Sequence, residues 1–342
     1  MGTLREEFMD DTSRVHCDID LDSPGLRAGN LHLPLSTDAS AWGRLLTPIV
    51  ACMGGPGPTL VLTGASHGDE YEGPLGILRL LQGLDASSLR GRIVALPALC
   101  YPALQAGRRL SPLDGANMNR SFPGRADGGP TAAIAHWVHT RLLPQADAVI
   151  DIHSGGSTLR FAPSAVIHEL ADPAQRAATR ALAEAFAAPF TQVLTELDSA
   201  GELDSAVEAM GLPFLSTELG GGGGVTPATV ALAHAGLLRC LAALGMLDAA
   251  PPASAPTRFL EVPEDGYVMA LRGGLLEPLI EVGDPVAAGQ IVARLYDIDT
   301  PLAPPLPLHA PADGVLVCRA ARGGVARGDT LAVVGRDGGH GA

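Results

Sequence analysis

Two short polar segments follow predicted strands and carry side chains that bind metals. His67 and Glu70 come after the apolar run 59–63, and His153 comes after the run 148–150. Apolar runs of this length, ending in glycine-rich loops, are typical of strands. Two imidazoles and one carboxylate at the edge of a sheet match the ligand set of a catalytic zinc ion with an open fourth position. We therefore predict that these three side chains bind one Zn²⁺ per subunit, with a water in the fourth position whose pKa falls toward about 7.

A further carboxylate follows a third predicted strand. Glu218 stands after the run 212–217 and before the glycines 220–224, where hydrophobic packing gives no reason for a charge. Removing a proton from the attacking water requires a carboxylate that is near the metal but not bound to it, so Glu218 is the candidate general base; a helix cap is the alternative. Asp151 precedes His153 by two residues and shares its strand face, where it could orient that ligand or cap a turn.

The order of the polar residues along the chain carries a family resemblance. The residues concerned are His67, Glu70, Arg109, Asn119, Arg120, His153 and Glu218. With this order, the region from about 45 to 245 resembles the zinc carboxypeptidase clan and, more closely, its succinylglutamate desuccinylase/aspartoacylase family. The resemblance implies an α/β fold with a carboxypeptidase-like mixed sheet flanked by helices. It also implies a zinc-dependent amidohydrolase that acts on a small N-acyl amino acid.

The resemblance further implies roles for the polar residues between the two metal-binding segments. Arg109 would stabilise the oxyanion, with the adjacent Arg108 as the alternative for that position and as a further substrate contact. Asn119 and Arg120 would hold the carboxylate of the substrate, for which the planar guanidinium is suited. From the residues alone, these arginines could instead lie on the surface. The sequence departs from the wider family at Tyr101-Pro102, where Asn-Pro is usual.

Four segments resemble enzymes of this family that share one particular substrate. They are Gly68–Pro74, Ala106–Pro112, Asn117–Gly124 and Thr217–Gly224, and they look most like bacterial enzymes that deacetylate Nα-acetyl-L-2,4-diaminobutyrate in ectoine degradation. Alternatives are aspartoacylase or desuccinylase activity on an acidic amino acid, a metallocarboxypeptidase, and a non-catalytic ligand-binding protein. The acidic stretch Glu196–Asp204 could pair with a cationic substrate side chain or form a solvated loop.

Composition excludes several other classes of function. The chain has 342 residues and a formal net charge of −14, which argues against a nucleic-acid partner. All 23 basic residues are arginine, so lysine Schiff-base chemistry is excluded. No apolar run reaches the about 18–20 residues of a membrane span, and no secretory leader is visible. Five scattered cysteines are typical of reduced thiols, so we expect a cytoplasmic protein. We expect a small molecule as its ligand, and a homo-oligomeric state stays open.

The spacing of apolar residues divides the chain into four parts. We predict an amino-terminal extension with short strands at 1–44, a catalytic domain at 45–248, a Pro/Ala linker at 249–256 and an all-β domain at 257–338. In the catalytic domain, helices are expected at 74–84, 131–143, 173–187 and 226–247, the last capped by Thr226 with Pro227 in its first turn. The runs 45–53 and 59–63 flank a Gly/Pro cluster and are expected to form a hairpin.

The carboxy-terminal part contains a weak internal repeat of strands and turns. The stretch that begins at Gly266 matches the one that begins at Gly314, which predicts a small barrel-sandwich. This resembles biotinyl and lipoyl carrier domains, but those carriers modify a lysine, and this chain has none. We therefore expect a structural module that gates the active site or contributes an oligomer contact.

Overall fold

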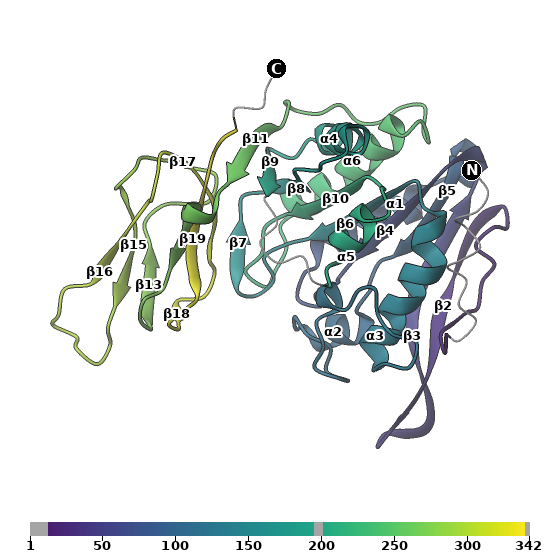
Figure 1. Ribbon diagram of the computed structural model, residues 1–342, viewed down its shortest axis with the longest axis horizontal. Helices are drawn as coiled ribbons and strands as arrows, with labels where there is room; N and C mark the ends of the chain where they lie inside the picture. The colour runs from purple at the N-terminus through teal and green to yellow at the C-terminus, as the bar shows by residue number, and fades with distance from the viewer. Residues whose placement is uncertain (1–12, 195–200, 339–342) are drawn as a thin grey trace.

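The fold is described for residues 13–194 and 201–338 of a computed structural model. A part with helices and a central sheet lies beside an all-β part formed by the carboxy-terminal residues (Figure 1). The two are joined through strands, because one 15-stranded sheet runs from the first into the second. The predicted α/β fold class with a smaller antiparallel β-region is confirmed.

The middle of the large sheet consists of parallel strands that are buried on both faces. β4 (Gly55–Gly64) pairs in parallel with β5 (Arg90–Leu96) and with β6 (Ala148–His153), and β6 pairs in parallel with β10 (Phe214–Glu218). Parallel strands joined by helical crossovers are covered by helices on both sides, which explains their nearly continuous apolar sequence.

The edge strands are longer than the sequence indicated. β2 (Gly25–Thr37) and β3 (Ser40–Met53) form a long antiparallel hairpin, to which β1 (His16–Cys17) adds. The predicted hairpin between 45–53 and 59–63 is wrong, because β5 lies between β3 and β4 and pairs with both. The chain leaves β4 through a helix and returns as a parallel strand, so the Gly/Pro cluster starts a strand and does not close a hairpin.

Helices cover the two faces of the sheet in separate layers. On one face lie α1 (Glu72–Gly83), α4 (Pro173–Phe186) and α6 (Pro227–Ala243), and on the other lie α2 (Tyr101–Ala106), α3 (Pro130–Trp137) and α5 (Leu203–Glu208). Alternate residues of β4 enter the two cores, Leu60 and Leu62 on the α1 side and Val61 on the α3 side. A π-helical turn, Val138–Leu142, extends α3.

The start of α6 follows the prediction from sequence. Thr226 is its N-cap and forms a capping box with Thr229, and Pro227 stands in the first turn. Among the described residues, no helix combines the length and the apolar character needed to cross a membrane.

The remaining strands extend the sheet toward the carboxy terminus. β8 (Ser164–His168) and β9 (Phe190–Leu194) continue it from β10, and β11 (Arg258–Val262) links β9 to β19 (Thr330–Asp337). Residues 257–338, which we call the C-terminal β-region, contain only strands, turns and one 3₁₀ turn within their described length. Its other strands are β12 (Tyr267–Met269), β13 (Gly274–Pro278), β14 (Pro285–Val286), β15 (Ile291–Tyr296), β16 (Leu306–His309), β17 (Gly314–Ala320) and β18 (Gly324–Val325).

A short strand of the catalytic region connects the two parts a second time. β7 (Leu159–Phe161) pairs with β17, and Phe161 lies opposite Cys318 in this pairing. The C-terminal β-region is therefore held directly beside the loops at the carboxyl ends of the parallel strands.

Candidate metal centre and active site

His67, Glu70 and His153 come together at one edge of the sheet. His67 and Glu70 lie on the loop between β4 and α1, and His153 is the last residue of β6. Since β4 and β6 are neighbouring parallel strands, their carboxyl ends meet at the same edge. The potential ligand atoms of His67, Glu70 and His153 all lie within 4.8 Å of one another. We call these three residues the metal group.

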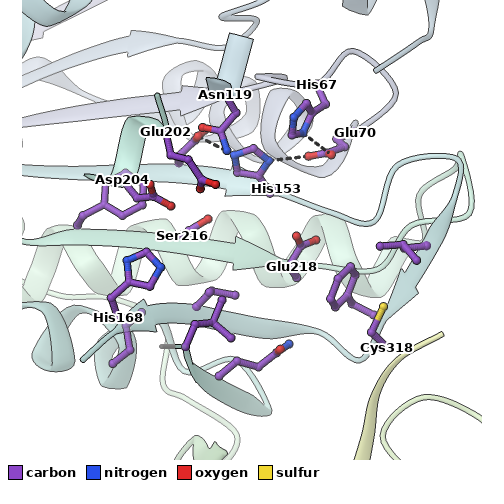
Figure 2. A pocket seen from close by; sticks show the side chains of 18 of the residues that line it. His67, Glu70, Asn119, His153, His168, Glu202, Asp204, Ser216, Glu218 and Cys318 are labelled. Carbon is purple, nitrogen blue, oxygen red and sulfur yellow. Dashed lines mark hydrogen bonds and ion pairs between the residues drawn. The ribbon is translucent and has the colours of Figure 1, made fainter. Parts of the chain in front are cut away.

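The two imidazoles of the metal group face one carboxylate. The Nδ1 atoms of His67 and His153 lie 2.8 Å from Oε1 and Oε2 of Glu70, respectively (Figure 2). The backbone N–H of Ser154 donates to Oε2 of the same carboxylate at 3.1 Å. All three side chains are buried, with 2–6% of their surface exposed. Their positions are therefore fixed by the protein and not by solvent.

Hydrogen bonds on the far side of each imidazole fix its orientation. Nε2 of His153 lies 2.7 Å from Asp151, and Nε2 of His67 lies 3.1 Å from Oδ1 of Asn117. The hydroxyls of Thr63 and Ser66 donate to the Asp151 carboxylate. With the proton held on Nε2, the lone pair of each Nδ1 points toward the shared centre, as in metal-binding histidines. Of the two readings of Asp151, this geometry favours the one that orients His153.

The electrostatics of the metal group favour a cation. Burial opposes ionisation of Glu70, but His153 and His67 outweigh it and hold the pKa of Glu70 well below its usual range. Burial lowers the pKa of His153, and the carboxylates of Asp151 and Glu70 more than compensate and raise it. Glu70 thus stays ionised beside a protonated His153, and a bound metal cation would supply this positive charge in place of the proton. Two nitrogens and a carboxylate, oriented by outer hydrogen bonds, fit a divalent metal such as zinc.

Glu218 stands beside the metal group without belonging to it. It is the last residue of β10 and lies opposite His153 in the parallel pairing with β6. Its Oε2 atom has no hydrogen-bond partner among the described residues. Burial, and then the nearby Glu70 carboxylate, raise the pKa of Glu218 to about 8. A carboxyl group without a structural partner, next to a metal group, is available for proton transfer.

Of the two adjacent arginines, Arg109 is the one that faces the metal group. Its Nη1 atom lies 3.3 Å from Nδ1 of His67 and 3.6 Å from Oε1 of Glu70, and it lines the pocket. Arg108 is not among the pocket-lining residues; its carbonyl accepts a hydrogen bond from the backbone of Gly68. The geometry thus assigns the position near the metal group to Arg109.

Asn119 and Arg120 enter the pocket from a 3₁₀ turn, Met118–Arg120. An Nη2 atom of Arg120 lies 2.6 Å from Oε1 of Glu202. The Oδ1 atom of Asn119 accepts a hydrogen bond from the backbone of Leu203 at 3.4 Å. Both residues therefore line the same pocket as the metal group and contact the start of α5.

The pocket that contains the metal group has a volume of about 390 Å³. On one side it is lined by Glu202 and Asp204, which lie beyond His153 from Glu70 (Figure 2). We call these two carboxylates the acid end. Of the acidic stretch 196–204 in the sequence, 196–200 lie outside the described residues. Glu202 is the N-cap residue of α5 and Asp204 lies in its first turn, and both line the pocket, where they could pair with a substrate side chain.

Some residues of the site were not identified from the sequence. Asn117 orients His67, and its signal was its place in the Asn117–Gly124 segment, two residues before Asn119. Tyr267 and Cys318 come from the C-terminal β-region and form another wall. No local pattern marks them, because strand pairing brings them to the pocket from more than a hundred residues away.

Comparison with known families identifies the class of protein. Residues 56–244 match the succinylglutamate desuccinylase/aspartoacylase catalytic domain, and the chain belongs to this family. The family predicted from the sequence is confirmed, and so is the prediction of an amidohydrolase that acts on linear amides.

Several relatives match nearly the whole chain. An Nα-acetyl-L-2,4-diaminobutyric acid deacetylase of Halomonas elongata is 41% identical over 94% of this chain and 95% of its own. The product-bound structure of the ectoine utilization protein EutE (DoeB) of Ruegeria pomeroyi is 43% identical, with a TM-score of 0.92 over 95% of this chain and 99% of that chain. A succinylglutamate desuccinylase structure from Silicibacter sp. TM1040 is 42% identical, with a TM-score of 0.92 over 96% and 99% of the two chains.

Proposed function

We propose that this chain is a zinc-dependent deacetylase of Nα-acetyl-L-2,4-diaminobutyrate, with one zinc ion per subunit. The observation that carries the proposal is the metal group with the unpartnered Glu218 carboxyl beside it. The deacetylase of Halomonas elongata, similar over 94% of the chain, supports the choice of substrate. Cytoplasmic location, a homo-oligomeric state and the four-part domain division stay predictions.

A zinc ion bound by the metal group would polarise the acyl carbonyl and make water a better nucleophile at neutral pH. Its positive charge would also favour the ionised form of Glu218, against the effect of burial. Glu218 accepts a proton from the attacking water. It then donates that proton to the amine nitrogen as the amide bond breaks, which releases acetate and the free amino acid.

The arginines act on the negative charges of the substrate. Arg109, beside the metal group, donates hydrogen bonds to the carbonyl oxygen as it gains charge in the transition state. Arg120 and Asn119 hold the substrate carboxylate, and a guanidinium can bind both of its oxygens. These groups act on atoms that every N-acyl amino acid contains, so they do not by themselves select the amino acid.

Metal analysis and a substrate panel test this function. The purified enzyme should contain about one zinc per chain; chelation should abolish hydrolysis, and added zinc should restore it. Nα-Acetyl-L-2,4-diaminobutyrate should be hydrolysed in preference to acetyl-aspartate, succinyl-glutamate and peptides. A clear preference for an acidic substrate would favour the aspartoacylase or desuccinylase alternative, and release of carboxy-terminal residues from peptides would favour a carboxypeptidase.

A further inference from the structure

One face of the central sheet forms the base of the pocket that contains both the acid end and the metal group; we call this base the floor. Strand pairing places Ser216 opposite both Asp151 and Val166, and Val166 opposite Gln192. Residues paired in this way have side chains on the same face of a sheet. All four line the same pocket as the metal group, so the floor continues from His153 across the sheet.

The acid end contains more negative than positive charge. Glu202 forms an ion pair with Arg120 at 2.6 Å, and Asp204 adds a second carboxylate beside it. His168 also acts on Glu202, but it is paired with a further carboxylate of the pocket, Glu208, at 3.0 Å. Burial, and then Asp204, raise the pKa of Glu202 to about 7, although Arg120 acts in the opposite direction. Two carboxylates that share one guanidinium leave a deficit of positive charge in a partly desolvated space.

An independent feature of the same pocket indicates a polar ligand. The side chain of Gln192 is only 3% exposed and lines the pocket, and its Nε2 atom has no hydrogen-bond partner among the described residues. Buried amides are almost always hydrogen-bonded, so an unpartnered one on a cavity wall indicates a missing polar partner. Because Nε2 donates, this partner must be an acceptor, such as a carboxylate or acyl oxygen of an N-acyl amino acid. Gln192 therefore supports a polar ligand over this surface, and the charge of the acid end determines which side chain that ligand carries.

We propose that Glu202 and Asp204 bind the ammonium group on the side chain of the substrate, so that the pocket selects N-acyl diamino acids. This inference rests on the proposed function of the same site. When the substrate binds, its carboxylate contacts Arg120 and its ammonium group contacts the acid end, so both partners of the Arg120–Glu202 pair keep an opposite charge. An N-acyl acidic amino acid would instead bring a third carboxylate against Glu202 and Asp204, which excludes it by repulsion.

Three substrates of similar shape separate charge from size. Nα-Acetyl-2,4-diaminobutyrate, Nα-acetylnorvaline and Nα-acetylglutamate have a cationic, a neutral and an anionic side chain of comparable length. The native enzyme should prefer the first. Asp204→Asn and Glu202→Gln should each lower kcat/KM for the cationic substrate by roughly 10- to 100-fold. The loss on the norvaline derivative should be smaller, because Glu202 also pairs with Arg120, so the ratio of kcat/KM for the cationic over the neutral substrate should fall in both variants. The relative rate on the glutamate derivative should rise.

Glu184→Gln is the matched control, because Glu184 pairs with Arg180 on α4 and does not line the active-site pocket. It should leave the preference among the three substrates as it is. An equal loss on the cationic and neutral substrates would overturn the assignment, since a merely structural role affects both. Hydrolysis by the native enzyme without preference for the ammonium group would overturn it too, while leaving the deacylase function standing. If none of the three is hydrolysed, the proposed function fails and this inference fails with it.

Discussion

The metal end of the pocket, with the metal group and the residues that orient it, and the wall from the C-terminal β-region are built in different ways. At the metal end, hydrogen bonds link the polar side chains in a series. Thr63 and Ser66 donate to Asp151, Asp151 contacts His153, and His153 contacts Glu70. In the wall from the C-terminal β-region, Cys318 is placed by the pairing of β17 with β7. None of the hydrogen bonds among the described residues joins this wall to the metal group.

This difference separates two demands on an active site. Proton transfer and metal binding require side chains held in one orientation, because small displacements cost much of the rate. Recognition of a small acyl group requires only a surface of the right shape. We therefore expect changes at the metal end to affect kcat, and changes in the wall to affect which acyl group is accepted.

The strongest test of this comparison is Glu218→Gln. The amide keeps the size of the side chain but cannot accept the proton, so kcat should fall by about 10²–10⁴-fold. Steady-state kinetics, with zinc content and substrate affinity measured on the same preparation, check this result. Since Glu218 is outside the metal group, zinc content should stay the same. A variant that retains most of its kcat would show that another group accepts the proton.

The sequence predicted the metal end better than the rest of the site, and the reason is physical. His67, Glu70 and His153 directly follow buried strands, and the ends of parallel strands meet at one edge. The local sequence pattern was therefore enough to predict that these three side chains lie together. The hairpin expected between 45–53 and 59–63 failed because β5 separates the two strands, and a turn signal does not say which strand comes between.

The wall and the acid end depend on contacts that are distant in sequence. Cys318 reaches the pocket because β17 pairs with β7, more than 150 residues earlier in the chain. Glu202 was visible in the sequence as part of an acidic stretch, but its place in the pocket depends on how α5 packs and on the ion pair with Arg120. Neither position follows from periodicity or composition.

The second test changes the wall. Cys318 is fully buried, lines the pocket and lies near Glu218 (Figure 2). Since Glu218 acts at the acyl carbonyl in the proposed reaction, we expect the acyl group to lie against this wall, and Cys318→Ala should make room for a larger one. We expect the ratio of kcat/KM for propionyl over acetyl substrates to rise by about 10-fold, the usual effect of one methylene in an apolar pocket. Competition between the two substrates measures this ratio directly.

Cys240→Ala is the control for that change. Cys240 is equally buried, but it belongs to the core beneath α4 and α6 and not to the pocket. It should lower stability without altering the acyl preference. If both variants change the ratio equally, the C-terminal β-region does not shape the acyl site, and the comparison between the two regions breaks down.

The smallest expected effect concerns stability, and it contrasts the carboxylate of the metal end with that of the acid end. The pKa of Glu70 is lowered in the fold, whereas that of Glu202 is raised to about 7 from an ordinary value of 4.5. Between pH 4.5 and about pH 7, Glu202 therefore binds more protons in the folded protein than in the unfolded chain. Its contribution to the free energy of unfolding is complete below about pH 4.5 and is lost as the pH rises through 7.

Asp204→Asn removes part of this contribution, because Asp204 is, after burial, the largest cause of the raised pKa of Glu202. Relative to the native protein, the variant should gain on the order of 1 kcal/mol between pH 5 and pH 8, after allowance for solvent screening. Urea unfolding at several pH values measures the difference, and effects of metal binding cancel because both proteins keep the same metal group. A difference between the two proteins that does not vary with pH would mean that the two carboxylates are not coupled, and the acid end would then lack the excess negative charge on which its selectivity depends.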